Sequence, residues 1–294
     1  MVAIKEVRNH IKSVQETLKI TNAMYLIASA GLRKAKKQLD DTLPYFNKIS
    51  STISDILYHS PEINHPYFDL RREKSPEERQ VGYIVITGDK GLCGAYNHNV
   101  LKLAETQLAG VANPSLFIVG QAGRIWFAHR NIRVDGEFMY TAQDPTLARA
   151  REICDVCLNL FRDGHLDDVF LLYTRMVNAM VMEPVAIKLF PLERELFQMD
   201  LVPADRLSET VKYVPSETAV MDRLVPSYLS GMIFGALVES FCSEQNARMT
   251  AMNSSSKNAQ KMLKSLNLTY NRVRQAAITQ EITEVVGGAR VDES

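Results

Sequence analysis

The chain has 294 residues, of which 46% are apolar and 23% charged, a composition typical of folded globular proteins that argues against extended disorder. Lys and Arg together number 34, as do Asp and Glu, so net charge gives no reason to expect nucleic acid as the main partner. We find no apolar run approaching the roughly 18 residues of a membrane span, and no hydrophobic secretory segment at the N-terminus. Four Cys without a dense framework suit a reducing cytoplasm.

The first sixty residues follow one helical period. Apolar side chains recur at alternating spacings of three and four from Ile4 to Ile56, and Thr is the polar exception. A 3.5-residue period held over about seven heptads predicts a long coiled-coil helix. Pro44 predicts a kink or a break near Leu43, because proline removes a backbone donor and clashes with the preceding turn.

Two features of this helix lie outside the seam. A second apolar stripe predicts contact with something beyond the coil partner, and it consists of Ile20, Met24 and Ile27. A basic group contains Arg33, Lys34, Lys36 and Lys37. This group could be a nucleic-acid patch or a solvated helix face. A third interpretation fits better, namely a surface complementary to an acidic protein.

The middle of the chain changes pattern. Residues 59–80 read as a polar linker, since they contain three prolines and a charged run. Short β-branched runs then predict strands at residues 81–87, 116–120, 132–134 and 169–174, with another inside 181–190. Helical patterns lie between them at residues 95–109, 122–131 and 146–162. Alternating strands and helices predict an α/β domain with a mostly parallel sheet over residues 81–200.

A second long helical pattern runs from about Pro215 to Val286, where Gly287 and Gly288 are predicted to stop it. Small residues on its seam allow close approach of two backbones. The simplest assembly pairs the two terminal helices as an antiparallel coiled coil, residues 1–58 with residues 210–288, and inserts the α/β domain at one end. The C-terminal helix is the longer one, so its end is predicted to extend alone by about 20 Å or more.

No motif in the sequence predicts catalysis. The turn from Gly88 to Gly94 follows a predicted strand, but its glycines have the spacing of neither common phosphate-binding fingerprint. A tight structural turn is the preferred reading, and nucleotide binding is the alternative. Cys154 and Cys157 form a C-x-x-C inside an amphipathic helix without a second pair, which favours core packing over redox or metal chemistry. The six dispersed histidines predict no metal site, and we expect no cofactor.

Several motifs resemble one family, the gamma subunits of F-type ATP synthases. The C-terminal run 276–289, AAITQEITEVVGGA, closely resembles the signature of that family. Residues 19–24, 32–35, 88–97, 243–249 and 270–275 are similar to it as well, so the resemblance spans essentially the whole chain. Gly31 departs from the pattern, since relatives often have a larger residue there. The cysteine-bearing insertion of chloroplast-type relatives is absent, so no thiol switching is expected from Cys154 and Cys157.

The resemblance implies a fold and a function. The fold would be an antiparallel coil of the terminal helices beside a Rossmann-like domain that binds no nucleotide. The chain would be a non-catalytic central rotor shaft that couples a membrane ion-driven ring to ATP synthesis or hydrolysis. Implied partners are the alpha and beta subunits, the epsilon subunit and the membrane c-subunit ring, with no nucleic acid and no transmembrane span. The implied location is the cytoplasmic face of a bacterial plasma membrane, where the chain would be peripheral.

The resemblance also implies particular residues. Those that match rotor–stator contact positions are Met24, Arg33, Lys34, Arg248, Arg274, Gln275 and Thr279. Those that match the C-terminal signature are Ile278, Thr279, Glu281, Glu284, Gly288 and Ala289. Two other classes of function compete with the rotor. One is a nucleotide- or small-molecule-binding α/β enzyme with coiled-coil oligomerisation arms, and the other is a generic coiled-coil scaffold.

Overall fold

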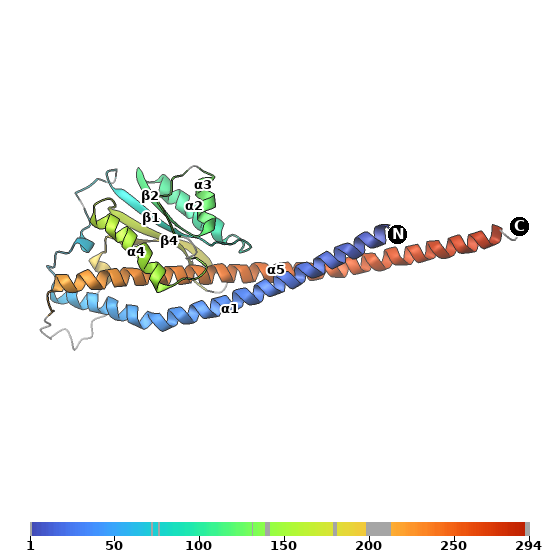
Figure 1. Ribbon diagram of the computed structural model, residues 1–294, viewed down its shortest axis with the longest axis horizontal. Helices are drawn as coiled ribbons and strands as arrows, with labels where there is room; N and C mark the ends of the chain where they lie inside the picture. Colours follow the sequence, from blue (N-terminus) through green and yellow to red (C-terminus); the bar gives the residue numbers. More distant parts are fainter. Residues whose placement is uncertain are drawn as a thin grey trace. The chain divides into compact units, whose positions relative to one another are not determined.

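The computed structural model describes residues 2–71, 73–75, 77–130, 132–138, 142–178, 181–197 and 213–291, and the side chains of these except at residues 2, 3 and 285–291. The chain divides into two compact units. The paired-helix unit comprises Met1–Ser29 and Arg248–Ser294, and the sheet unit comprises Ala30–Ala247. Figure 1 shows the elements, coloured along the sequence.

Two long helices, α1 (Val2–His59) and α5 (Glu217–Val291), each contribute to both units. α1 is not broken at Pro44, so helical packing outweighs the one hydrogen bond that proline removes. The predicted stop at Gly287 and Gly288 is wrong, because α5 continues to Val291. Each glycine lowers helix propensity by about 1 kcal/mol relative to Ala, which weakens a helix without ending it.

A five-stranded sheet forms the body of the sheet unit. Its strands are β1 (Gln80–Ile86), β2 (Asn113–Val119), β3 (Gly136–Phe138), β4 (Asp168–Met176) and β5 (Met182–Phe190). They lie in the order β3-β2-β1-β4-β5, all parallel except β5, which pairs antiparallel with β4. This mostly parallel sheet confirms the predicted α/β class.

The predicted strand at residues 132–134 is wrong in position. Ile132 and Val134 pack against the apolar cluster that one face of the sheet forms with the helices on it, but the strand that pairs with β2 begins at Gly136. A Cβ at Gly136 would lie 2.8 Å from Phe117 Cδ1, so the ring of Phe117 requires a glycine at this register. A glycine carries no β-branched signal, and for that reason the sequence pattern places the strand four residues too early.

Three further helices connect the strands, and each corresponds to a predicted one. They are α2 (Tyr96–Ala109), α3 (Gln121–Ala128) and α4 (Leu147–Arg162). One large apolar core joins α4, one sheet face, and the parts of α1 and α5 in this unit. Figure 1 shows α4 on the side of the sheet that faces the two long helices, with α2 and α3 on the other side.

Within the sheet unit α1 and α5 run antiparallel. Gly31 lies near Phe241, Phe46 lies on Gly231, and Ser60 Oγ donates to Glu217 Oε1 at 3.5 Å. A Cβ at Gly231 would lie 2.2 Å from Phe46 Cδ1, so the ring rests directly on the α5 backbone. The small seam residue therefore permits close approach of the helices, as predicted.

In the paired-helix unit the predicted seams of both helices are covered. Val14 and Ala28 of α1 are buried, as are Met252 and Ala259 of α5. A polar contact interrupts the apolar seam, because the hydroxyls of Thr21 and Ser256 lie 2.8 Å apart and Ser256 Oγ donates to Asn22 Oδ1 at 2.9 Å. A buried polar pair of this kind fixes the register of two helices.

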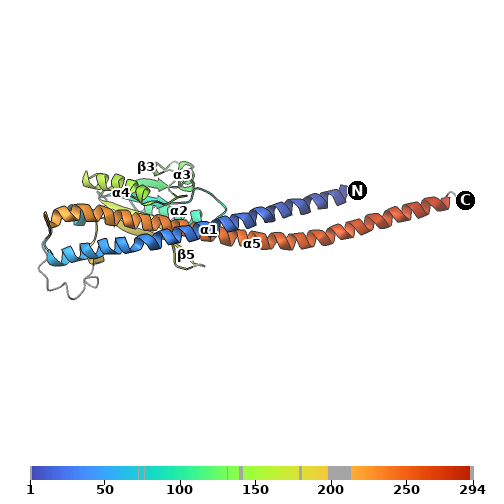
Figure 2. The same ribbon diagram turned by 60° about the horizontal axis from the view of Figure 1, so that its bottom comes forward.

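α5 extends beyond the end of α1 in this unit, as Figures 1 and 2 show. From Arg274 to Glu284 the side chains are exposed except for that of Ala277, which is partly buried. The helix continues to Val291, so this extension is roughly 25 Å long at 1.5 Å per residue. The structure thus agrees with the predicted unpaired C-terminal end.

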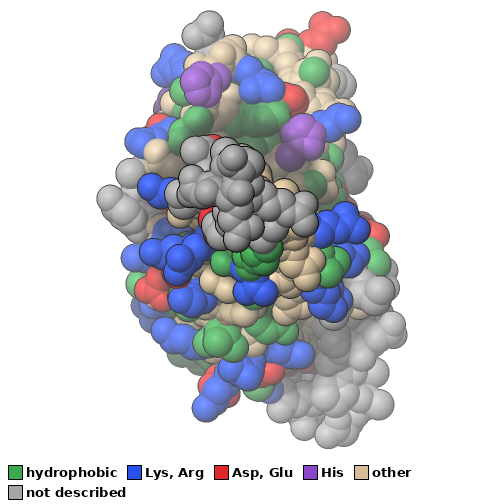
Figure 3. All heavy atoms as spheres, turned by 90° about the vertical axis from the view of Figure 1, so that its right-hand side faces the viewer, with side chains coloured by type: hydrophobic (Ala, Val, Ile, Leu, Met, Phe, Trp, Pro, Cys, Tyr) green, Lys and Arg blue, Asp and Glu red, His purple; other side chains and the backbone are tan. Residues whose placement is uncertain are grey.

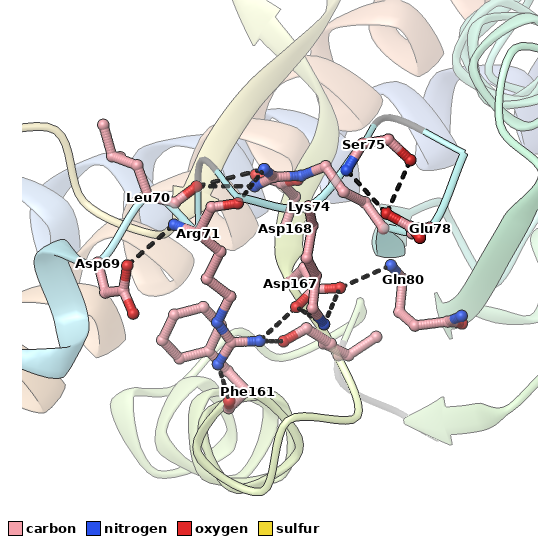
Figure 4. A network of polar contacts seen from close by, with 12 residues as sticks. Asp69, Leu70, Arg71, Lys74, Ser75, Glu78, Gln80, Phe161, Asp167 and Asp168 are labelled. Atoms are coloured by element: carbon pink, nitrogen blue, oxygen red, sulfur yellow. Dashed lines mark hydrogen bonds and ion pairs between the residues drawn. The ribbon is translucent and has the colours of Figure 1, made fainter.

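The predicted linker packs closely on the sheet unit. Its residues His65, Tyr67 and Phe68 are buried, the latter two in a short 3-10 helix, Pro66–Phe68. Figure 4 shows how its later part is held. Asp167, which has no exposed side-chain surface, accepts hydrogen bonds from Arg71 Nη1 at 2.6 Å, Lys74 Nζ at 2.7 Å and the N–H of Gln80 at 2.9 Å. We call these four residues the Asp167 clamp.

One described helix segment, Glu217–Glu284, contains a window that is long and apolar enough to cross a membrane by composition. Over half of that window, 56%, is buried inside the structure. Leu229, Ile233 and Phe234 belong to the large apolar core of the sheet unit. The window is therefore explained as a core helix.

Candidate functional site

The turn after β1 has the position of a phosphate-binding loop, between a strand and the helices that follow. Gly120 precedes α3 with a φ of 95°, and a Cβ there would lie 2.2 Å from the carbonyl oxygen of Thr87. The N–H of Gln121, at the start of α3, donates to Asp89 Oδ1 at 2.8 Å. A carboxylate of the chain thus occupies the helix N-terminus where a bound phosphate would be stabilised, and it would repel one.

A cavity of about 370 Å³ lies beside this turn. Its lining mixes cations and carboxylates, and Arg124 Nη1 already pairs with Glu137 Oε2 at 3.5 Å. Among the described residues no group of three His, Cys, Asp or Glu side chains could hold a metal ion. This mixed lining offers no concentrated charge for a nucleotide.

Cys154 and Cys157 lie in the apolar core on α4. Burial raises the pKa of the Cys154 thiol to about 11 and that of the Cys157 thiol to about 12. Since the thiolate is the reactive form, these side chains are poor nucleophiles and poor metal ligands at neutral pH. Their environment agrees with the core-packing interpretation of the C-x-x-C.

The exposed surface of the paired-helix unit is both apolar and basic. On α1 the side chains of Ile20, Leu26 and Ile27 are 59%, 66% and 71% exposed, and near the end of α5 Ile278 and Ile282 are 47% and 59% exposed. Exposed basic residues of the unit include Lys5, Arg8, Lys12, Lys19, Lys257, Lys261, Lys264, Arg272 and Arg274. Figure 3 draws side chains of both units, and on the face it shows the blue Lys and Arg side chains outnumber the red acidic ones. A helix pair with such a surface is suited to a partner that supplies apolar and acidic groups.

The structure distributes the predicted contact residues over both units. The paired-helix unit contains Met24, Arg248, Arg274, Gln275 and Thr279, and the sheet unit contains Arg33 and Lys34. Met24 is partly buried and Arg248 is buried, at 8% exposure, which limits the surface that Arg248 can offer a partner. The others are exposed, as are Ile278, Glu281 and Glu284. The side chains of Gly288 and Ala289 lie outside the described residues.

Comparisons with known proteins identify the family. A family model described as ATP synthase matches residues 3–291. The chain is 47% identical to the ATP synthase gamma chain of Ruminiclostridium cellulolyticum, over 97% of each chain. It is 46% identical to the gamma chain of Acetivibrio thermocellus, over 98% of this chain and 99% of that one. The chain belongs to the ATP synthase gamma-chain family.

The fold agrees with this family. The OSCP/F1/c-ring assembly of the Euglena gracilis mitochondrial ATP synthase includes a chain with a TM-score of 0.64 at 16% identity, covering 98% of this chain and 94% of that one. As a gamma chain, the protein is a non-catalytic central-stalk subunit of a membrane-associated ATP synthase. The function predicted from the sequence, a rotor subunit of ATP synthase, is confirmed, and the alternative of an α/β enzyme is not supported.

Sequence reasoning missed two polar groups in the sheet unit. One is the Asp167 clamp, in which Asp167 lies more than 85 residues along the chain from each of its three partners. The other is a buried polar stretch of α5, Ser240 and Ser243–Asn246. The sequence does contain a pattern that could have predicted this second group. A run of polar residues on a helix whose neighbouring residues form the core predicts buried hydrogen bonds.

Proposed function

We propose that this gamma chain acts as a shaft whose one-sided surface imposes different conformations on the subunits around it. The observation that carries the proposal is the unpaired end of α5, which exposes Ile278 and Ile282 on a helix without a coil partner. Exposed apolar side chains on such a helix need an external sleeve to bury them. A ring of alternating alpha and beta subunits would supply it.

Such a shaft drives chemistry without catalytic groups. Three chemically identical sites around one asymmetric rod experience three different contact surfaces. At each angle the rod favours an open state in one neighbour and a closed state in another, by its difference in contact free energy. Rotation permutes these preferences, so ion-driven turning of the shaft becomes ATP synthesis, and ATP hydrolysis turns the shaft in reverse.

The proposal assigns partners and contacts. The ring subunits would meet Met24, Arg33, Lys34, Arg248, Arg274, Gln275 and Thr279, and the basic surface would face acidic loops. The sheet unit would join the epsilon subunit and the membrane c-subunit ring. The bacterial relatives support a location at the cytoplasmic face of the plasma membrane, where the chain would be attached through the complex.

Reconstitution with alpha and beta subunits tests the function. The four cysteines are buried, so Lys102→Cys on the exposed face of α2 gives one accessible thiol for a visible tag. We expect ATP hydrolysis by the complex and unidirectional turning of the tag. Hydrolysis with a stationary tag, or no assembly with the ring subunits, would contradict the proposal.

Gln275→Ala tests the contact assignment. Gln275 is exposed on the unpaired part of α5, so its removal costs the chain little stability, and we expect a severalfold lower rate of ATP synthesis in the complex because a contact with the ring is lost. Gln260→Ala is the matched control, since Gln260 is an exposed amide on the part of α5 that pairs with α1. Equal synthesis rates in both variants would refute the role of Gln275.

A further inference from the structure

One face of α5 carries polar side chains toward the ends of two central strands. This face contains Glu239, Ser240, Ser243 and Glu244, together with the apolar Ala247, at the spacings of a single helix face. All of them are buried except Glu239, which is partly buried. This face is distinct from the seam that meets α1.

The strand ends and the α5 face are joined by hydrogen bonds. Ser240 Oγ lies 2.8 Å from the hydroxyl of Tyr96 at the start of α2. Ser243 Oγ donates to the carbonyl of Thr174 in β4 at 3.0 Å. The N–H of Met176, also in β4, donates to Glu239 Oε1 at 3.2 Å.

The same face also fits closely against the turn after β1. A Cβ at Gly88 would lie 2.9 Å from Glu244 Cδ, so the glycine leaves just enough space for the Glu244 carboxylate. Ala247 packs in a small cluster with Cys93 and Tyr96. The α5 face is therefore enclosed from two directions, by β4 and by the β1–α2 turn.

This location has a general meaning in open α/β sheets. β1 lies between β2 and β4, and the crevice outside the carboxyl ends of β1 and β4 is where the strand order reverses. Ligands of such sheets bind in that crevice. In this protein side chains of α5 fill that crevice. The place where other sheets of this kind bind a ligand is therefore occupied by a helix of the chain itself.

We propose that Glu239, Ser240 and Ser243 are positioning residues that lock α5 to the sheet, so that torque passes between the sheet and α5. We call this set of contacts the α5 interlock. It deepens the proposed rotor function and rests on it. Apolar packing is non-directional, whereas hydrogen bonds depend steeply on distance and angle.

The geometry shows why these bonds would resist rotation. A turn of α5 by about 10° about its axis would move an atom about 5 Å from that axis by roughly 1 Å. A displacement of this size would stretch the bond at 2.8 Å beyond hydrogen-bonding distance. The interlock would therefore oppose even small rotations of α5 against the sheet.

The test is a double variant, Tyr96→Phe with Ser240→Ala, in the complex of the gamma chain with alpha and beta subunits. Removing both hydroxyls leaves neither one buried without the other, and the further hydrogen bond lost at Ser240 Oγ, from the N–H of Thr174, is long at 3.5 Å, so the chain still folds. A bead is attached either to the sheet unit through Lys102→Cys or to α5 through Arg223→Cys, at two exposed positions. We expect the torque measured at the sheet bead to fall at least about twofold, while ATP hydrolysis and the torque at the α5 bead remain unchanged.

Two comparisons make the result decisive. Ser227→Ala removes a hydroxyl that bonds the carbonyl of Arg223 inside α5, and Ser240→Thr keeps the hydroxyl at the interlock; neither should lower the torque. Unchanged torque at the sheet bead in the double variant, or an equal loss at both beads, would overturn the interlock. Failure of the proposed function would be distinct, since the unsubstituted chain would then turn neither bead.

Discussion

Asp167→Asn is expected to destabilise the sheet unit by about 3 kcal/mol at neutral pH, because it leaves a partly buried guanidinium without its counter-charge. The side chain of Arg71 is 15% exposed, and its Nη atoms also donate to the carbonyls of Leu166 and Phe161. Arg71 is therefore held in place and cannot turn to water. Lys74, at 38% exposure, can reach solvent, so the loss should lie at the low end of the range for broken buried pairs.

The pH dependence gives this prediction a second readout. Burial alone would raise the pKa of the Asp167 carboxyl, but hydrogen bonds from Lys74, the N–H of Gln80 and Arg71 lower it from 3.8 to about 2. Because the pKa is lower in the folded state, the stabilisation is present above pH 4 and is lost as the pH falls toward 2. It amounts to about 2 kcal/mol. The difference in stability between the unsubstituted chain and Asp167→Asn should therefore narrow over that range.

Urea unfolding of the full chain measures both effects. The single tryptophan, Trp126, lies in α3, so its fluorescence reports on the sheet unit. Glu78→Gln is the matched control: it removes a carboxylate that is exposed and bonds the nearby Ser75. We expect the control substitution to change the free energy of unfolding by less than about 0.5 kcal/mol. Equal changes in the two variants would show that the clamp contributes no more than a surface charge.

The contrast between seam and clamp shows what the sequence could predict. A helical seam is local, because each position repeats the spacing of the last, and Val14, Ala28 and Ile53 are buried where the period places them. The clamp joins residues from the linker, β1 and the turn before β4, and no spacing relates them. The strand at Gly136 is another such case, since its register is decided by Phe117 across the sheet.

The residues of the candidate site also divide into those with a local sequence pattern and those whose environment depends on distant parts of the chain. Ile20, Met24 and Ile27 deviate from the seam, and that local signal predicted a contact beyond the coil partner. In the structure Ile20 and Ile27 are exposed, and Met24 is partly buried. The burial of Arg248 was not predictable, because a basic residue on a long helix has the same local pattern whether or not other elements cover it. The α5 interlock depends on where α2 places Tyr96 and β4 places Thr174, which the periodicity of α5 does not encode.

Gly231→Ala and Gly235→Ala are expected to change stability in opposite directions, although both replace a glycine of α5 by a better helix former. A Cβ at Gly235 meets no heavy atom within 4 Å, so Gly235→Ala should stabilise the chain by up to about 1 kcal/mol through helix propensity. At Gly231 the same methyl group overlaps the ring of Phe46. Overpacking at Gly231 should cost about 1–3 kcal/mol of stability. This cost should outweigh the gain in helix propensity, so Gly231→Ala should destabilise the chain.

A double-mutant cycle with Phe46→Leu separates the two contributions at Gly231. Phe46 also packs against Phe234, with ring centroids 6.3 Å apart, so its ring cannot move away from α5 without losing that contact. If the ring causes the loss, Gly231→Ala should cost less in the Phe46→Leu background, with a coupling of at least about 0.5 kcal/mol. No coupling, together with equal stabilisation by both alanines, would mean that α1 and α5 do not approach closely at Gly231. The two helices could then not act as one stiff element in this part of the shaft.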